Sequence, residues 1–130
     1  MEIIDVVMPL QEGRYIPQEV LEGLVRQGIP FRLWVSTKVS DGNYAKARNN
    51  IKQYGKSSYI LMLDNDIVLP PGAIIKMQRF LDNHSEFAAI AIRKSDPPVP
   101  EKEGGASTPP HVDMSCVLFR KEILEKIIFS

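Results

Sequence analysis

Two aspartates separated by one asparagine, Asp64 and Asp66, follow the most hydrophobic run of the sequence, Tyr59 to Leu63. Two carboxylates spaced in this way in a loop can turn toward the same hard divalent cation, because Mg²⁺ and Mn²⁺ bind carboxylate oxygens and fill their other sites with water and phosphate. By itself the triplet is equally compatible with a polar turn. The buried run before it and the helix start after it favour a metal site, since a simple turn needs no rigid mounting.

The elements that would position this motif alternate between short β-rich runs and helical patterns, which is typical of an α/β fold with a mainly parallel sheet flanked by helices. The continuous apolar run before Asp64 predicts a strand that is buried on both faces in the middle of the sheet. Pro9 is expected to close the first strand. The predicted strands cover 3–8, 31–36, 58–63, 87–92 and 112–119, and the predicted helices cover 17–28, 41–55, 71–81 and 121–128.

The length and composition predict one compact domain over 1–130, because 130 residues with 44% hydrophobic content suffice for a single core. The first helix is expected to bury an apolar stripe of Val20, Leu21, Leu24 and Val25. Between 94 and 110 the sequence "KSDPPVPEKEGGASTPP" has almost nothing to bury, which predicts a mobile loop.

The charge balance argues against several partners. The 16 Lys and Arg residues match 16 Asp and Glu residues, so no overall field would recruit nucleic acid or an anionic membrane. The single Cys116 lies in an apolar context, where a small buried side chain is expected. The N-terminal stretch is acidic where a signal peptide is basic, and no apolar run approaches the roughly 20 residues of a membrane span. We therefore expect a cytoplasmic protein without a transmembrane segment, while peripheral membrane attachment and homo-oligomerisation stay open.

The order of the motifs resembles the GT-A nucleotide-sugar glycosyltransferases, especially their large inverting group. The "ARNN" ahead of "SSYILMLDNDIVLPPGAI" is similar to the "ARN" that precedes a strand ending in DxD and a "lpp" helix start in that group. The opening "VVMPLQEGRYIPQEVLEGLVRQGIPFRLWVS" resembles the first strand, first helix and second strand of the family. The stretch "VDMSCVLFRKEILEKI" is similar to the strand and short helix after the loop. The resemblance covers nearly the whole chain and implies a minimal, Rossmann-like GT-A domain.

The resemblance also implies roles for individual residues. Asp64 and Asp66 would be the DxD pair, with Asp66 as the direct ligand of a Mn²⁺ or Mg²⁺ ion that bridges the diphosphate of a sugar donor. Arg48 and Asn49 match the "ARN" and would hold the diphosphate or the nucleotide. Pro9 matches the end of the first strand, which borders the base and the ribose.

Three further candidates lie in or near loops. Asp41 is a candidate nucleotide contact, although the family places an acidic pair at the end of the second strand, where this chain has Ser36 and Thr37. His111 could complete the metal shell or contact a phosphate, and it fits an ordinary surface histidine as well. Asp113 could be the base that deprotonates the acceptor, and it fits a hydrogen-bonded strand start as well.

These assignments predict a metal-dependent glycosyltransferase of the hexosyltransferase type, which binds a UDP- or GDP-sugar and uses a glycan, lipid or protein acceptor. The family carries a further acidic segment after the region matching "FRKEILEKI", whereas this sequence stops at Ser130, so transfer by this chain alone is less secure than donor binding. One alternative is a non-catalytic nucleotide- or metal-binding module. The other is a haloacid-dehalogenase-like phosphatase, which fits less well because 63 residues precede Asp64 and no adjacent acidic pair follows it.

Overall fold

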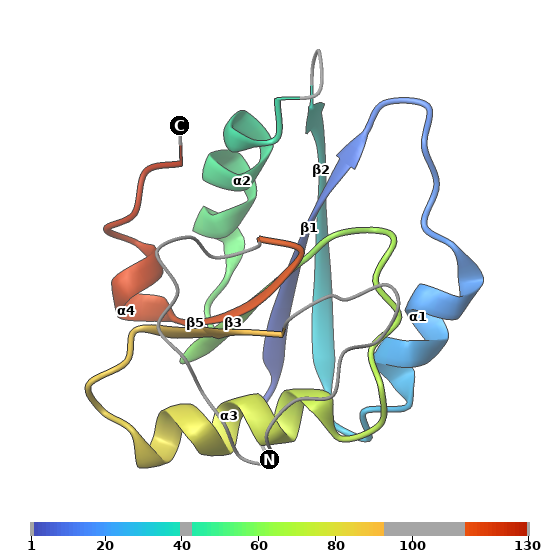
Figure 1. Cartoon of the computed structure of the whole chain (residues 1–130). Coiled ribbons are helices and arrows are strands. Elements are labelled where there is room, and N and C mark those ends of the chain that lie inside the picture. The colour runs from blue at the N-terminus through green and yellow to red at the C-terminus, as the bar shows by residue number, and fades with distance from the viewer. Residues whose placement is uncertain (1, 40–42, 93–113, 130) are drawn as a thin grey trace.

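The computed structural model describes residues 2–39, 43–92 and 114–129, which form a five-stranded sheet between two layers of helices (Figure 1). The predicted α/β fold with helices flanking a sheet is confirmed. The strands are β1 (Ile4–Gln11), β2 (Phe31–Val39), β3 (Tyr59–Leu63), β4 (Ala89–Ala91) and β5 (Cys116–Arg120). The helices are α1 (Gln18–Val25), α2 (Ala45–Ile51), α3 (Ala73–Asn83) and α4 (Lys121–Leu124), and a 3₁₀ turn, η1 (Lys52–Tyr54), follows α2.

The sheet has the strand order β2-β1-β3-β5-β4. β1 pairs in parallel with β2 and with β3, whereas β5 pairs antiparallel with β3 and with β4. The expectation of a mainly parallel sheet is therefore only partly right, because β5 makes the sheet mixed. β1, β2, β3 and β4 still run in one direction, so their carboxyl ends and the start of β5 share one edge. We call this the carboxyl edge.

The strand β3 lies in the middle of the sheet, as predicted, and all five of its side chains are buried. Leu61 and Leu63 join the apolar cluster that α1 and α3 cover. Ile60 and Met62 join a second cluster on the α2 and α4 side. Each buried aliphatic side chain contributes about 1.5–3 kcal/mol to the free energy of folding. This strand is therefore a rigid mount for the residues that follow it.

The first strand continues through Pro9 to Gln11, so the prediction that Pro9 closes it is wrong. The backbone N–H of Ile4 points toward β2, and that of Asp5 points toward β3. Because these directions alternate along a strand, the nitrogen of Pro9 lies on the β3 side. Pairing with β3 ends at Val7, so the missing donor of Pro9 breaks no ladder bond.

The helix α1 buries a narrower stripe than expected. Val20 and Leu24 are buried, but Leu21 is 38% exposed and Val25 66% exposed. The helix is rotated so that Gly23 faces the chain after β3, where an added Cβ would lie 3.1 Å from the backbone nitrogen of Leu69. This contact brings α1 against the segment that carries the two aspartates.

Gln27, just beyond α1, also holds the chain after β3 in place. Its side chain is buried, and its Nε2 donates to the carbonyl oxygens of Gly23 (3.0 Å) and Pro70 (2.9 Å). Its Oε1 accepts a hydrogen bond from the backbone N–H of Ile74 (3.1 Å) in the first turn of α3, which has no side-chain cap at its N-cap residue. One glutamine thus joins the end of α1 to the start of α3.

Replacing Gln27 by leucine is expected to lower the free energy of unfolding by about 3 kcal/mol, because the buried N–H of Ile74 and the carbonyl of Pro70 lose their partner. Urea denaturation followed by circular dichroism measures the change. The matched control is Gln53→Leu, on the exposed surface of η1. Equal stability of the two variants would contradict the role given to Gln27.

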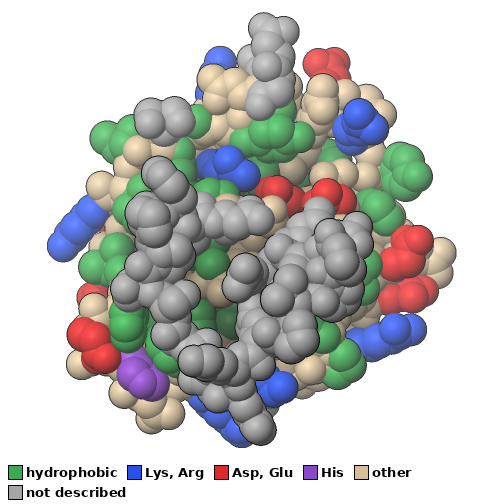
Figure 2. All heavy atoms as spheres, in the orientation of Figure 1, with side chains coloured by type: hydrophobic (Ala, Val, Ile, Leu, Met, Phe, Trp, Pro, Cys, Tyr) green, Lys and Arg blue, Asp and Glu red, His purple; other side chains and the backbone are tan. Residues whose placement is uncertain are grey.

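The surface matches the balanced composition. In the coloured part of Figure 2, acidic and basic side chains alternate with polar and apolar ones, and no broad field of one sign forms. Cys116 is buried, as expected for a small apolar side chain. Within the described ranges, no helix combines the length and the apolar character that crossing a membrane requires.

Candidate functional site

The two aspartates lie in a turn at the carboxyl edge, directly after β3. The backbone N–H of Asp64 donates to the carbonyl of Ser115 (2.8 Å), which extends the pairing of β3 with the start of β5. The carbonyl of Asp64 accepts from the N–H of Ile67 (3.4 Å) and closes the turn. The Asp64 side chain is 26% exposed, and Asp66 is exposed. The buried strand therefore delivers one half-buried and one exposed carboxylate to the edge.

Arg48 of α2 reaches the first of these carboxylates. Its Nη2 lies 3.4 Å from Oδ1 of Asp64, and its side chain is 15% exposed. Alternation along β3 places Asp64 on the same face as Ile60 and Met62, which is the face that α2 covers. The sequence motifs placed both Arg48 and Asp64 in one predicted ligand site. The fold brings the two residues together from α2 and from the end of β3.

The guanidinium of Arg48 keeps donors for a further acceptor. Among the described residues, its Nε is buried and has no hydrogen-bond partner. The contact with Asp64 is the only hydrogen bond found for its side chain in this part of the chain. The ring of Tyr44 lies 5.5 Å from its Cζ and supports the cation by a cation–π contact. A guanidinium has five N–H donors, so Arg48 can hold Asp64 and also contact an anion.

Asn49, the next residue of the predicted "ARN", faces away from Asp64. Its Nδ2 donates to the carbonyl oxygen of Phe129 (2.8 Å), and its Oδ1 accepts from the N–H of Phe129 (2.8 Å). Both ends of the amide are therefore engaged by the C-terminal segment. A direct contact between Asn49 and a nucleotide stays a prediction.

Pro9 lies beside the aspartates on the carboxyl edge. It is buried and pairs in register with Ser36 of β2. The last pair between β1 and β3 is two residues before Pro9 and two before Asp64, so these residues occupy the same level of neighbouring strands. The hydroxyl of Ser36 donates to Oδ1 of Asn50 on α2 (3.3 Å). The ends of three strands and one face of α2 therefore converge here.

Asp41, His111 and Asp113 lie outside the described residues, as does the predicted loop at 94–110. Their assignments as a nucleotide contact, a metal ligand and a base stay predictions. Within the described part, no group of three or more His, Cys, Asp or Glu side chains is arranged to hold a metal. The pair Asp64 and Asp66 fits Mg²⁺ or Mn²⁺, because these ions need only one or two protein carboxylates when phosphate and water complete the shell.

Asn65 separates the two aspartates and was given no role from the sequence, but it makes a hydrogen bond in the structure. Its Nδ2 donates to the carbonyl oxygen of Tyr15 (3.2 Å), in the loop after β1. Spacing gave no signal for this contact, because the partner lies 50 residues earlier in the chain. The aspartate turn is thus tied to the loop that follows the first strand.

Asp5 is a buried carboxylate that the sequence analysis missed. It lies at the amino end of β1, away from Asp64, and its only signal was an acid inside an apolar strand. Burial by itself raises the pKa of Asp5, but the donors outweigh it and hold the pKa well below its usual range. The donors are Arg32 Nε and Nη2 (2.8 and 3.0 Å), Trp34 Nε1 (2.9 Å), Lys56 N (2.7 Å) and Ser57 N (2.8 Å).

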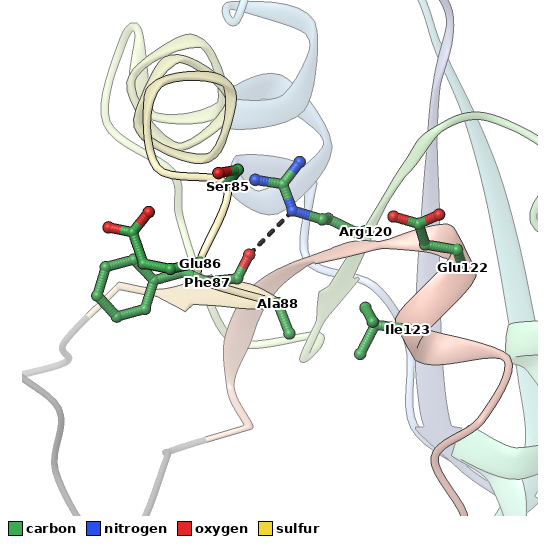
Figure 3. A pocket seen from close by; sticks show the side chains of 7 residues that line it. All are labelled: Ser85, Glu86, Phe87, Ala88, Arg120, Glu122 and Ile123. Carbon is green, nitrogen blue, oxygen red and sulfur yellow. Dashed lines mark hydrogen bonds between the residues drawn. The ribbon is translucent and has the colours of Figure 1, made fainter.

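A hollow of about 240 Å³ lies between the start of β4 and the end of β5 (Figure 3). These strand ends are at the edge of the sheet opposite the carboxyl edge. Arg120 lines the hollow and donates from Nε to the carbonyl oxygen of Phe87 (2.9 Å). The same guanidinium also donates to the carbonyls of Leu81 and His84. Arg120 therefore joins the end of α3 to the start of β4, and we assign it a structural role.

The carboxyl edge thus combines a largely buried arginine, a half-buried carboxylate and an exposed carboxylate. Arg48 can contact an anion such as a phosphate, while Asp64 and Asp66 can contact a divalent cation. Such a set is suited to a ligand that carries both, namely a metal-bound diphosphate. No protein-family model matches the chain, and no curated protein gives a significant match.

Proposed function

We propose that the chain binds a UDP- or GDP-sugar through Mn²⁺ or Mg²⁺ at Asp64 and Asp66, and that it acts as a glycosyltransferase of the GT-A type. The observation that carries the proposal is the meeting of Arg48 with Asp64 beside Asp66 at the carboxyl edge. In open α/β sheets, ligands bind beyond the carboxyl ends of the strands. The resemblance of the sequence motifs to that family supports the same reading.

Each residue has a defined part in the proposal. Asp66 and Asp64 would hold the metal, and Asp64 would also keep its contact with Arg48. The metal would supply positive charge for the leaving nucleoside diphosphate. Arg48 donates to the phosphate oxygens from the N–H groups that Asp64 does not use, and the edge around Pro9 receives the ribose and base. Asp113 is the proposed base for a glycan, lipid or protein acceptor.

Titration calorimetry with UDP, GDP and their sugar conjugates, with and without Mn²⁺, tests the proposal. Binding is expected only with the metal, and sugar release or transfer is expected on incubation with the bound donor. Metal-dependent binding without turnover would identify a non-catalytic module. Hydrolysis of phosphate monoesters without nucleotide binding would identify a phosphatase and overturn the proposal.

Replacing Arg48 by methionine is expected to weaken nucleoside-diphosphate binding by at least about tenfold, because a charge-assisted hydrogen bond to phosphate is lost while the side-chain stem is kept. Titration with Mn²⁺ alone should show no loss of affinity, since Arg48 competes with the metal for Asp64. Arg79→Met, on the exposed face of α3, is the matched control. Unchanged nucleotide affinity in Arg48→Met would remove Arg48 from the site.

A further inference from the structure

The segment after α4, residues 125–129, lies along α2 and is held there by its backbone. In Figure 1 it runs from α4 upward beside α2. The two hydrogen bonds between Asn49 and Phe129 are both 2.8 Å long and join residues 80 positions apart. The Asn49 amide thus pairs with both the N–H and the carbonyl of Phe129, in the way that a residue of a neighbouring β-strand would. We call residues 125–129 the C-terminal strap.

Lys52, three residues after Asn49, makes the second contact with this region. Its Nζ donates to the carbonyl oxygen of Leu124 (3.3 Å) and lies 5.7 Å from the ring centroid of Phe129. The Phe129 ring in turn packs edge-on against Phe119 of β5, with 6.5 Å between the ring centroids. The strap therefore connects α2 to the strand that pairs with β3.

The helix α2 needs an external support of this kind. It has only seven residues, and so short a helix is marginal by itself. Two consecutive asparagines lower its intrinsic stability further. Ala47 and Ile51 anchor its inner face in the core. The rotation of α2 about its own axis also depends on contacts made by its other faces. Asn49 makes two of these contacts, both hydrogen bonds of 2.8 Å.

Rotation of α2 matters because Arg48 precedes Asn49 on the same turn. The contact of Arg48 with Asp64 is already long at 3.4 Å, so a shift of about 1 Å breaks it. Consecutive helical residues point about 100° apart, so Asn49 cannot turn toward the strap unless Arg48 turns toward β3. The strap contact and the ion pair therefore select the same orientation of the helix.

We propose that Asn49 is a positioning residue, which acts through the backbone of Phe129 to hold Arg48 beside Asp64. Its effect on nucleotide binding rests on the proposed function, whereas its effect on the orientation of Arg48 does not. Asn49 then influences the diphosphate without touching it. The C-terminal strap becomes part of the support of the site.

The first test substitutes Asn49→Leu, which keeps the size of the side chain but removes both the acceptor and the N–H donors that bind the backbone of Phe129. Solvent exchange at the backbone N–H of Phe129 and at the buried Nε–H of Arg48, measured by NMR, should each accelerate about tenfold. Gln53→Leu makes the corresponding change on exposed η1 and should change neither rate. Faster exchange at Phe129 with an unchanged rate at Arg48 Nε would overturn the proposal.

The second test separates positioning from direct contact with the ligand. Phe129→Pro removes the backbone N–H that donates to Oδ1 of Asn49, and it leaves the Asn49 side chain unchanged. Positioning predicts that both Phe129→Pro and Asn49→Leu exchange faster at Arg48 Nε and bind UDP more weakly in the presence of Mn²⁺. If only Asn49→Leu loses affinity for UDP, Asn49 touches the nucleotide and positioning is wrong. If the unmodified chain binds no nucleoside diphosphate, the proposed function fails, and the exchange rates alone decide the role of the strap.

Discussion

Replacing Asp66 by alanine is expected to weaken metal-dependent binding of UDP and GDP by about 100-fold or more, which is the largest effect on function that we predict. Asp66 is exposed at the carboxyl edge, two residues beyond the carboxylate that Arg48 contacts. Removing it leaves Asp64 as the one carboxylate of the motif, and Arg48 already competes for that group. Calorimetric titration of UDP in the presence of Mn²⁺ measures the change.

Glu86→Ala is the matched control, because Glu86 is an exposed acid at the opposite edge of the sheet. Its nucleotide affinity should equal that of the unmodified chain, and both variants should have unchanged circular dichroism. If Asp66→Ala kept its metal-dependent affinity, the metal site would have to lie elsewhere. A phosphatase would instead lose phosphate-ester turnover in Asp64→Asn, with Asp66 of lesser effect.

Replacing Asp5 by alanine is expected to lower the free energy of unfolding by about 3–5 kcal/mol, the largest effect on stability that we predict. The variant leaves the buried backbone N–H of Ser57 and the indole N–H of Trp34 without their acceptor. Urea denaturation at neutral pH measures the loss. Glu12→Ala, in an exposed loop, is the control and should change stability by less than about 0.5 kcal/mol. Comparable stabilities for the two variants would contradict a structural role for Asp5.

The same residue predicts a dependence of stability on pH. The pKa of Asp5 is lowered in the folded state, so the unfolded chain takes up this proton at a higher pH than the folded chain does. The contribution of Asp5 is therefore complete above the usual aspartate pKa of about 4 and is lost as the pH falls below it. Urea denaturation at a series of acidic pH values should show a steeper fall in stability for the unmodified chain than for Asp5→Ala. Parallel curves would exclude this linkage.

Local sequence patterns were enough to predict the elements that carry the site. The uninterrupted apolar run of β3 identified a central strand, because a strand buried on both faces needs apolar side chains at every position. The same patterns failed where two arrangements bury the same residues. β5 is apolar whether it runs parallel or antiparallel to β3, so its direction could not be predicted. Pro9 likewise fits inside a strand once β3 has ended its pairing there.

The sequence by itself determined that two carboxylates follow the central strand and that an arginine stands on the preceding helix. Only the tertiary structure decided that Arg48 faces Asp64 while Asn49 faces Phe129. The reason is physical: neighbouring helical positions point about 100° apart, and the packing of α2 on the sheet sets which of them meets β3. The partner of Asn49 lies 80 residues away, beyond the reach of any local pattern.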